Sequence, residues 1–168
     1  MVTRAIVAFP QIGQIEVIQR LRKRCDPLMA RIAPHLTLVF PFESALTTDE
    51  LAEHISKAVA GFEPFSARLQ GITGQEGEYL FLDVKCGNDQ LIELHDRLYS
   101  GPLAPFIRPE FTYTPHLTVG RLPDTDAFHA ALDDARQVTM VFEATVAEVT
   151  LYQIEPGLAR PIEYVTRL

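Results

Sequence analysis

Two short stretches of the chain repeat one pattern, in which a histidine and a threonine are separated by a single residue. The first stretch holds His35 and Thr37, and the second holds His116 and Thr118, about half of the 168-residue chain further on. A neutral imidazole can take a proton from water while a protonated one gives a proton to a leaving oxygen. Threonine hydroxyls can donate hydrogen bonds to phosphate oxygens. These residue types therefore suit the hydrolysis of a strained phosphodiester, a reaction that two imidazoles can carry out without a metal ion.

Both patterns are expected on β-strands, because they are rich in β-branched and apolar residues. Side chains of a strand point alternately to its two faces. The face opposite the apolar residues is expected to carry His35, Thr37 and Val39 in the first copy and His116, Thr118 and Gly120 in the second. One copy alone would more often be an ordinary strand with a polar edge. Two copies, each preceded by a proline, favour a functional pair.

The elements around these patterns predict an α+β fold in which the order strand, helix, strand, helix, strand occurs twice. Strands are expected near residues 5–9, 35–40, 65–72, 79–84, 116–119, 138–151 and 162–168, and helices near residues 15–25, 47–61, 88–98 and 124–135. The alternation changes parity near Ala147, which predicts a bulge or a break there. Pro156 and Gly157 predict a turn. We expect a single domain over residues 1–168 with two similar lobes.

The overall composition restricts the partners that the chain could bind. The formal net charge is -7 and the sequence pI is about 5.2, which argues against an extended nucleic-acid binding surface. No signal-peptide pattern begins the sequence, and no apolar run reaches the roughly 18 residues of a membrane span. Cys25 and Cys86 are not closely spaced, so both are expected to be free, buried thiols. We therefore expect a cytoplasmic monomer without a membrane partner.

The two patterns in their wider context resemble the paired signatures of a known superfamily. Residues 34–42 (PHLTLVFPF) and 114–121 (TPHLTVGR) are similar to those of the 2H phosphoesterases. The most similar branch is the 2′-5′ RNA ligase family with its relatives, the RNA 2′,3′-cyclic phosphodiesterases. The stretch 149–152 and the final strand from Ile162 extend the resemblance over most of the chain.

This resemblance carries expectations about fold and mechanism. It implies two β-sheets with helices packed outside, in lobes related by a pseudo-two-fold axis and facing a central cleft. It also implies metal-independent opening of a cyclic phosphate or cleavage of a 2′-5′ linkage. His35 and His116 would be the catalytic pair, and Thr37 and Thr118 would hold the phosphate. The resemblance further favours His116 as the base that activates water and His35 as the acid.

Four more residues are candidates for contact with substrate. Phe9, Phe42 and Tyr113 lie near the two patterns and could stack on a base, with ordinary core packing as an equal alternative. Arg121 follows the second pattern but is predicted on the face opposite His116. A contact between Arg121 and phosphate would therefore need a local irregularity of the strand.

Other polar residues are expected to have ordinary structural roles. The basic cluster Arg20, Arg22, Lys23 and Arg24 is expected to form a solvated helix face that complements the helix dipole. The remaining histidines, expected on helices at or near the surface, are His54, His95 and His129. Their spacing matches no zinc motif, so neither a metal nor another cofactor is expected.

The leading hypothesis is a phosphodiesterase that acts on a 2′,3′-cyclic phosphate or a 2′-5′ linkage, at an RNA end or on a small nucleotide. One alternative is a phosphodiesterase for another small cyclic phosphate. Another is a non-catalytic module that binds an RNA end or a nucleotide, although binding alone does not require two proton-transfer groups. The sequence leaves open the physiological substrate, the choice between 2′ and 3′ product, and whether ligation occurs.

Overall fold

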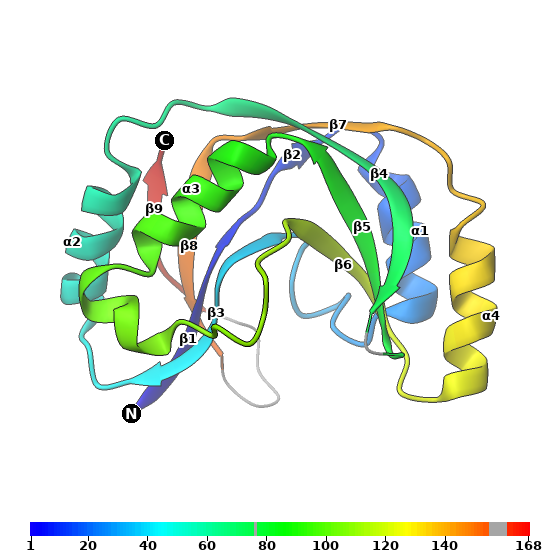
Figure 1. The fold of residues 1–168 in the computed structure, drawn as a ribbon, viewed down its shortest axis with the longest axis horizontal. Coiled ribbons are helices and arrows are strands. Elements are labelled where there is room, and N and C mark those ends of the chain that lie inside the picture. The colour runs from blue at the N-terminus through cyan, green and yellow to red at the C-terminus, as the bar shows by residue number, and fades with distance from the viewer. Residues whose placement is uncertain (76, 155–160) are drawn as a thin grey trace.

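The computed structural model describes residues 1–75, 77–154 and 161–168 (Figure 1). Its strands are β1 (Val2–Ala8), β2 (Gln11–Ile12), β3 (Leu36–Ser44), β4 (Phe65–Gln75), β5 (Tyr79–Cys86), β6 (His116–Arg121), β7 (Phe142–Val146), β8 (Glu148–Gln153) and β9 (Ile162–Arg167). Its helices are α1 (Ile15–Cys25), α2 (Thr48–Val59), α3 (Asn88–Leu98), the 3-10 helix η1 (Gly101–Phe106) and α4 (Thr125–Ala135). The predicted α+β class is confirmed.

The strands form one strongly curled antiparallel sheet, in the order β2-β7-β4-β5-β6-β3-β1-β8-β9. The expectation of two sheets was therefore wrong. The two halves join in the middle, where β3 and β6 pair through Leu36 and Leu117. Each of these strands would otherwise be the edge of its own half, and the single shared pair makes the sheet continuous.

The helices pack on the sheet in an order that differs from their order in the sequence (Figure 1). Helix α1 follows the first two strands in sequence but packs against β6, while α3 packs against β3. Helix α2 packs against α3 and β9, and α4 packs against β4. The spatial halves of the molecule are thus not the two successive halves of the sequence. The main core lies between these helices and the sheet.

Most predicted boundaries are confirmed, and a few are shifted. Helix α2 begins with a capping box in which Thr47 and Glu50 bond each other's backbone N–H groups, and Asp124 caps α4. The predicted break near Ala147 separates β7 from β8. Strand β7 begins only at Phe142, because residues 138–141 have no strand partner. The predicted turn at Pro156 lies outside the described residues.

Two β-bulges change which side chains share a face with the motif threonines. On β3, Thr37 pairs with Val7 but Val39 pairs with Ile6, so Leu38 is the extra residue. On β6, Thr118 pairs with Phe81 but Gly120 pairs with Leu80, so Val119 is the extra residue. Both bulges directly follow a motif threonine.

The consequence of the bulges is a reversal of the alternation. Val39 and Gly120 are buried, which corrects the prediction that they share a face with the histidines. Phe40 and Arg121 instead take that face. We call it the motif face, meaning the sheet face that carries His35, Thr37, His116 and Thr118.

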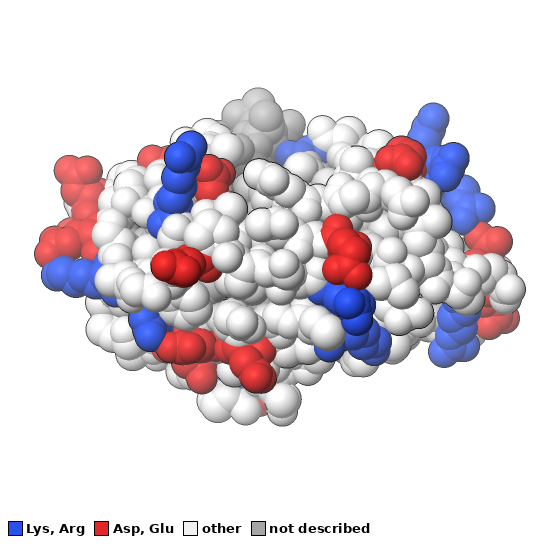
Figure 2. Space-filling view, turned by 90° about the horizontal axis from the view of Figure 1, so that it is seen from above, with Lys and Arg blue, Asp and Glu red and all other residues white. Residues whose placement is uncertain are grey.

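The predictions for the surface charge and for the two cysteines are confirmed only in part. Acidic and basic side chains are interspersed on the face seen in Figure 2, with no broad basic area. Both cysteines are free thiols, but only Cys25 is buried, and Cys86 is exposed at the end of β5. Within the described ranges, no helix combines the length and apolar character needed to cross a membrane.

Candidate active site

The pairing of β3 with β6 brings the two His-x-Thr motifs side by side at the middle of the sheet. Because Leu36 pairs with Leu117 in an antiparallel ladder, position 37 stands opposite 116 and position 35 opposite 118. Leu36 and Leu117 are fully buried on the helix side. The two histidines and two threonines therefore project together from the motif face, where all four are half-buried. A local pseudo-two-fold axis between Leu36 and Leu117 therefore relates the two motifs.

Each motif histidine is held by the backbone just before it. His35 Nδ1 lies 2.9 Å from the carbonyl oxygen of Ala33, and His116 Nδ1 lies 2.7 Å from that of Thr114. A carbonyl oxygen only accepts hydrogen bonds, so each Nδ1 carries the proton and Nε2 is the basic nitrogen of the neutral ring. A proline follows each of these carbonyl residues and favours the extended backbone there. Both histidines are thus held in the tautomer that carries its proton on Nδ1.

His116 lies in an environment that disfavours its charged form. Its ring stacks on Phe81 of β5, with centroids 3.6 Å apart and planes 19° apart. Burial lowers the pKa of His116 below its ordinary value of 6.5, although the Thr114 carbonyl and the Asp83 carboxylate act in the opposite direction. Near pH 7 the imidazole of His116 is therefore mainly neutral and basic at Nε2.

Asp83 is a site residue that the sequence reasoning missed. It pairs with His116 across β5 and β6, so its side chain shares the motif face. Its carboxylate accepts hydrogen bonds from Thr73 Oγ1 and Lys85 Nζ, each at 2.9 Å. The strand alternation in residues 79–84 was visible in the sequence, but the register that sets Asp83 beside His116 was not.

His35 has a different aromatic neighbour. The ring of Phe9 lies edge-on to it, with centroids 6.0 Å apart and planes 64° apart. Phe9 also packs against a small apolar cluster formed by Ala5, Val7, Ile32 and Tyr152. Of the three aromatic candidates, Phe9 is the one in contact with a motif histidine.

The other two aromatic candidates contact other parts of the protein. Phe42 is buried in the main core and packs on Phe106, with centroids 5.2 Å apart. Tyr113 donates a hydrogen bond from its hydroxyl to the Thr37 carbonyl at 2.9 Å, and its ring stacks on His95. Core packing is thus the outcome for Phe42, while Tyr113 supports the first motif strand from its edge.

Arg121 lies on the motif face because the bulge at Val119 supplies the irregularity that a phosphate contact would need. It pairs with Tyr79, and its guanidinium lies over that ring, 5.2 Å from the centroid. Its Nε is 3.3 Å from a carboxylate oxygen of Glu78. The prediction that Arg121 faces away from His116 was therefore wrong.

Arg22 is buried, which corrects the prediction of a fully solvated basic helix face. Its side chain is 1% exposed, and its Nε bonds Asp26 Oδ2 at 2.8 Å. Its Nη2 donates to the carbonyl of Ile32 at 2.8 Å. Residues 26–34, which we call the 26–34 loop, lead directly into His35. Arg22 therefore anchors the backbone next to Ala33, whose carbonyl orients the His35 ring.

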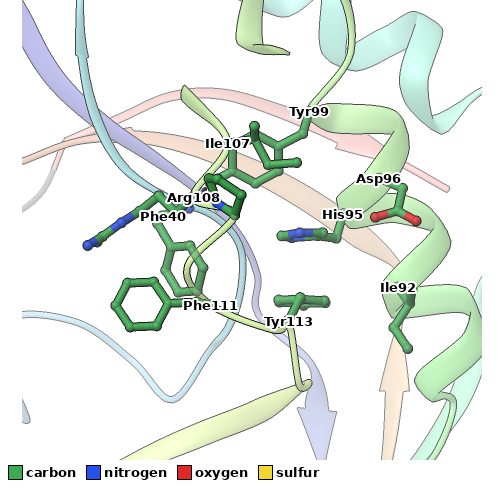
Figure 3. Close-up of a pocket in the computed structure, with 10 residues that line it drawn as sticks. Phe40, Ile92, His95, Asp96, Tyr99, Ile107, Arg108, Phe111 and Tyr113 are labelled. Carbon is green, nitrogen blue, oxygen red and sulfur yellow. Dashed lines mark hydrogen bonds between the residues drawn. The ribbon is translucent and has the colours of Figure 1, made fainter. Parts of the chain in front are cut away.

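Beyond Leu36 the edge of β3 is completed by side chains instead of β6. The carbonyls of Thr37 and Leu38 accept hydrogen bonds from Tyr113 and His95, and the Phe40 N–H donates to the Tyr99 hydroxyl at 3.0 Å. Beside this edge lies a cavity of about 270 Å³ (Figure 3). Its lining residues are Phe40, Ile92, His95, Asp96, Tyr99, Ile107, Arg108, Pro109, Phe111 and Tyr113. Within the described part of the chain, no group of three or more histidine, cysteine or acidic side chains is arranged to hold a metal ion.

Comparisons with known proteins agree with this geometry. A protein of Bacillus pumilus named "Putative phosphoesterase" is 32% identical over 158 residues, which cover 90% of each chain. Escherichia coli LigT in its apo form has the same fold, with a TM-score of 0.69, 22% identity, and coverage of 99% of this chain and 97% of that one. Its complex with NADP+ gives a TM-score of 0.64, 21% identity, and coverage of 99% and 98%. The family model of the 2′-5′ RNA ligase superfamily matches residues 9–157, and the chain therefore belongs to this superfamily.

Proposed function

We propose that this protein is a metal-independent phosphodiesterase that opens a 2′,3′-cyclic phosphate, or cleaves a 2′-5′ linkage, at an RNA end or on a nucleotide. The observation that carries the proposal is the matched pair of imidazoles. Both are held by backbone carbonyls at Nδ1, and both stand on one face with a threonine opposite each. Such a pair can supply an acid and a base on the two sides of one phosphorus atom.

In the proposed reaction His116 is the base. Its lowered pKa keeps it neutral, so Nε2 can take a proton from water as the water oxygen bonds to phosphorus. The bond from phosphorus to one ribose oxygen breaks, and protonated His35 gives a proton to that oxygen. The products are a phosphomonoester and a free hydroxyl, which together contain the atoms of the cyclic ester and one water. Proton exchange with solvent then restores both rings.

The two threonines are proposed to bind the non-bridging phosphate oxygens. Thr37 stands opposite His116 and Thr118 opposite His35 in the ladder, so the hydroxyls flank the space between the rings. Hydrogen bonds from these hydroxyls stabilise the charge that develops on the phosphate oxygens. Phe9 and Arg121 extend the site on either side and are proposed as contacts to the nucleoside or to a second phosphate.

Two further observations favour a small nucleotide or a single RNA end as substrate. Crystal structures of E. coli LigT hold NADP+, 3′-AMP and ATP, which are all nucleotides. The net charge of -7 disfavours contact with a long nucleic-acid backbone. The same charge also fits a cyclic phosphate on another small metabolite, which stays the second candidate.

The test is hydrolysis of 2′,3′-cyclic mononucleotides in the presence of EDTA, with the monoester product followed by phosphorus NMR. We expect turnover in EDTA and a loss of about 10²–10⁴-fold in His35→Ala and in His116→Ala. Thr37→Ala and Thr118→Ala should each cost about 1–3 kcal/mol, as expected for a hydrogen bond to a charged group.

The matched control is His129→Ala, which removes an exposed histidine on α4 and should leave the rate unchanged. Activity that disappears in EDTA and returns with a divalent ion would contradict the mechanism. Binding of cyclic nucleotides with no turnover would instead indicate a non-catalytic module.

A further inference from the structure

The cavity beside β3 has a preformed aromatic wall. Tyr113 and His95 are stacked with centroids 3.8 Å apart and planes 5° apart, and Tyr99 packs edge-on against His95 at 4.8 Å (Figure 3). All three side chains are also tied to the β3 backbone by hydrogen bonds. Their rings are therefore fixed before any ligand arrives, which reduces the entropy lost on binding.

The rim of the cavity exposes large apolar side chains. Ile92, Ile107 and Phe111 are 37%, 50% and 42% exposed, and all three line the cavity. The guanidinium of Arg108 lies over the Phe111 ring, 4.6 Å from its centroid. Apolar groups gathered around a concavity are typical of a ligand site. A volume of about 270 Å³ is near the lower end for small-ligand pockets, so the cavity suits one ring system.

The cavity also offers hydrogen-bond acceptors. His95 Nδ1 donates to the Leu38 carbonyl, so Nε2 carries a lone pair. Asp96 lines the cavity as well, and its carboxylate forms no ion pair with any described residue. Two acceptors beside an aromatic wall favour a planar ligand that carries N–H donors, such as adenine with its amino group.

The cavity and the candidate active site share strand β3, which carries Thr37 and Phe40. The bulge at Leu38 turns Phe40 to the motif face, so Phe40 lines the cavity from the same strand face as Thr37. Phe40 is three positions after Thr37, which corresponds to about 10 Å along a regular strand. Tyr113 also contacts both places, since it lines the cavity and bonds the Thr37 carbonyl.

We propose that this cavity binds a nucleobase of the substrate whose phosphate lies between His35 and His116. The inference rests on the proposed function for the position of the phosphate, but the cavity itself can be tested without turnover. The base stacks among Phe40, Phe111 and Tyr113, and its amino group donates to His95 Nε2 or Asp96.

The first experiment measures binding alone. The probe is 2-aminopurine riboside, a fluorescent nucleoside without phosphate that is quenched when it stacks on aromatic rings. We expect saturable quenching by the wild-type protein and roughly 5- to 100-fold weaker binding in Phe111→Ala, the usual effect of removing one stacking partner. The matched control is Ile162→Ala, which removes a side chain that is 60% exposed on β9 at the far edge of the sheet.

The second experiment compares two substrates, adenosine 2′,3′-cyclic phosphate and the abasic ribose 2′,3′-cyclic phosphate. Phe111→Ala should raise KM for the first roughly 5-fold or more and leave the second unchanged. Asp96→Asn should weaken binding of adenosine more than binding of purine riboside, which lacks the amino group.

Absence of quenching by the wild-type protein, or quenching that Phe111→Ala leaves unchanged, would overturn the inference. Equal KM changes for the two substrates would also overturn it. If quenching depends on Phe111 but neither cyclic phosphate is hydrolysed, the proposed function fails while the base site stands. The two proposals can thus be separated.

Discussion

Replacement of Arg22 by methionine tests whether the 26–34 loop positions the imidazole of His35, which we propose is catalytic. The Arg22 and Asp26 side chains are 1% and 5% exposed, so Arg22→Met leaves a buried carboxylate without its partner. Breaking a buried pair from one side costs about 3–5 kcal/mol, a large part of the roughly 5–15 kcal/mol of a typical domain. The variant should therefore unfold at much lower urea concentration and lose activity.

The double variant Arg22→Met/Asp26→Leu separates stability from positioning. Because no buried charge remains, most of the lost free energy of unfolding should return. The Ile32 carbonyl and the Leu28 N–H still lose their partners, which leaves a deficit of about 1–3 kcal/mol. The anchor next to Ala33 stays absent, so kcat should remain about tenfold or more below wild type while the protein is folded.

Urea unfolding gives the free energies, and hydrolysis of a 2′,3′-cyclic mononucleotide gives kcat. The control is Arg24→Met, which breaks an ion pair between Arg24 and Asp134 on side chains that are 59% and 57% exposed. That change should cost about 0–1 kcal/mol and leave kcat unchanged. Full recovery of kcat in the double variant would refute the positioning role of Arg22. Wild-type stability in Arg22→Met would refute the burial argument.

Three further predictions concern the surroundings of the motifs. Phe81→Leu replaces the ring stacked on His116 with a smaller group that admits more water, so the pKa of His116 should rise and the acidic limb of the pH–rate profile should move to higher pH. Asp83→Asn removes a carboxylate that raises the pKa of His116, so the acidic limb should move to lower pH. Shifts in the same direction for Phe81→Leu and Asp83→Asn would contradict the assignment of that limb to His116. Gly120→Ala would place a Cβ 2.8 Å from the Cβ of Cys25 and 3.2 Å from the Cys25 carbonyl oxygen. The free energy of unfolding, measured in urea, should therefore fall by about 1–3 kcal/mol. Unchanged stability would show that α1 can shift away from β6.

Much of the architecture could be predicted from local patterns. The motif strands, the capping box at Thr47 and the break near Ala147 depend on neighbouring residues alone, and all three are confirmed. The join of the two halves into one sheet depends on the single pair Leu36 and Leu117. No pattern within either strand encodes that pair, which is why two sheets were expected.

The placement of the two histidines and two threonines on one sheet face was predictable, but the contacts around them were not. Alternation assumes an unbroken pleat, and the bulges at Leu38 and Val119 reverse it, so Val39 and Arg121 were assigned to the wrong face. The burial of Arg22 depends on a loop that folds back over α1. A run of charges on a helix gives no sign of such a contact. His95, assigned to a helix at or near the surface, is buried because the edge of β3 requires a hydrogen-bond donor there.

In the proposed mechanism, two imidazoles transfer protons in opposite directions, with His116 as base and His35 as acid. The most direct test is the hydrolysis of a 4-nitrophenyl phosphodiester, whose leaving group needs no protonation, by His35→Ala and His116→Ala. We predict that this substrate restores the rate of His35→Ala to near that of wild type and leaves His116→Ala impaired by about 10²–10⁴-fold. Restoration of His116→Ala alone would reverse the two roles. Restoration of neither variant would show that the histidines bind the phosphate without transferring protons.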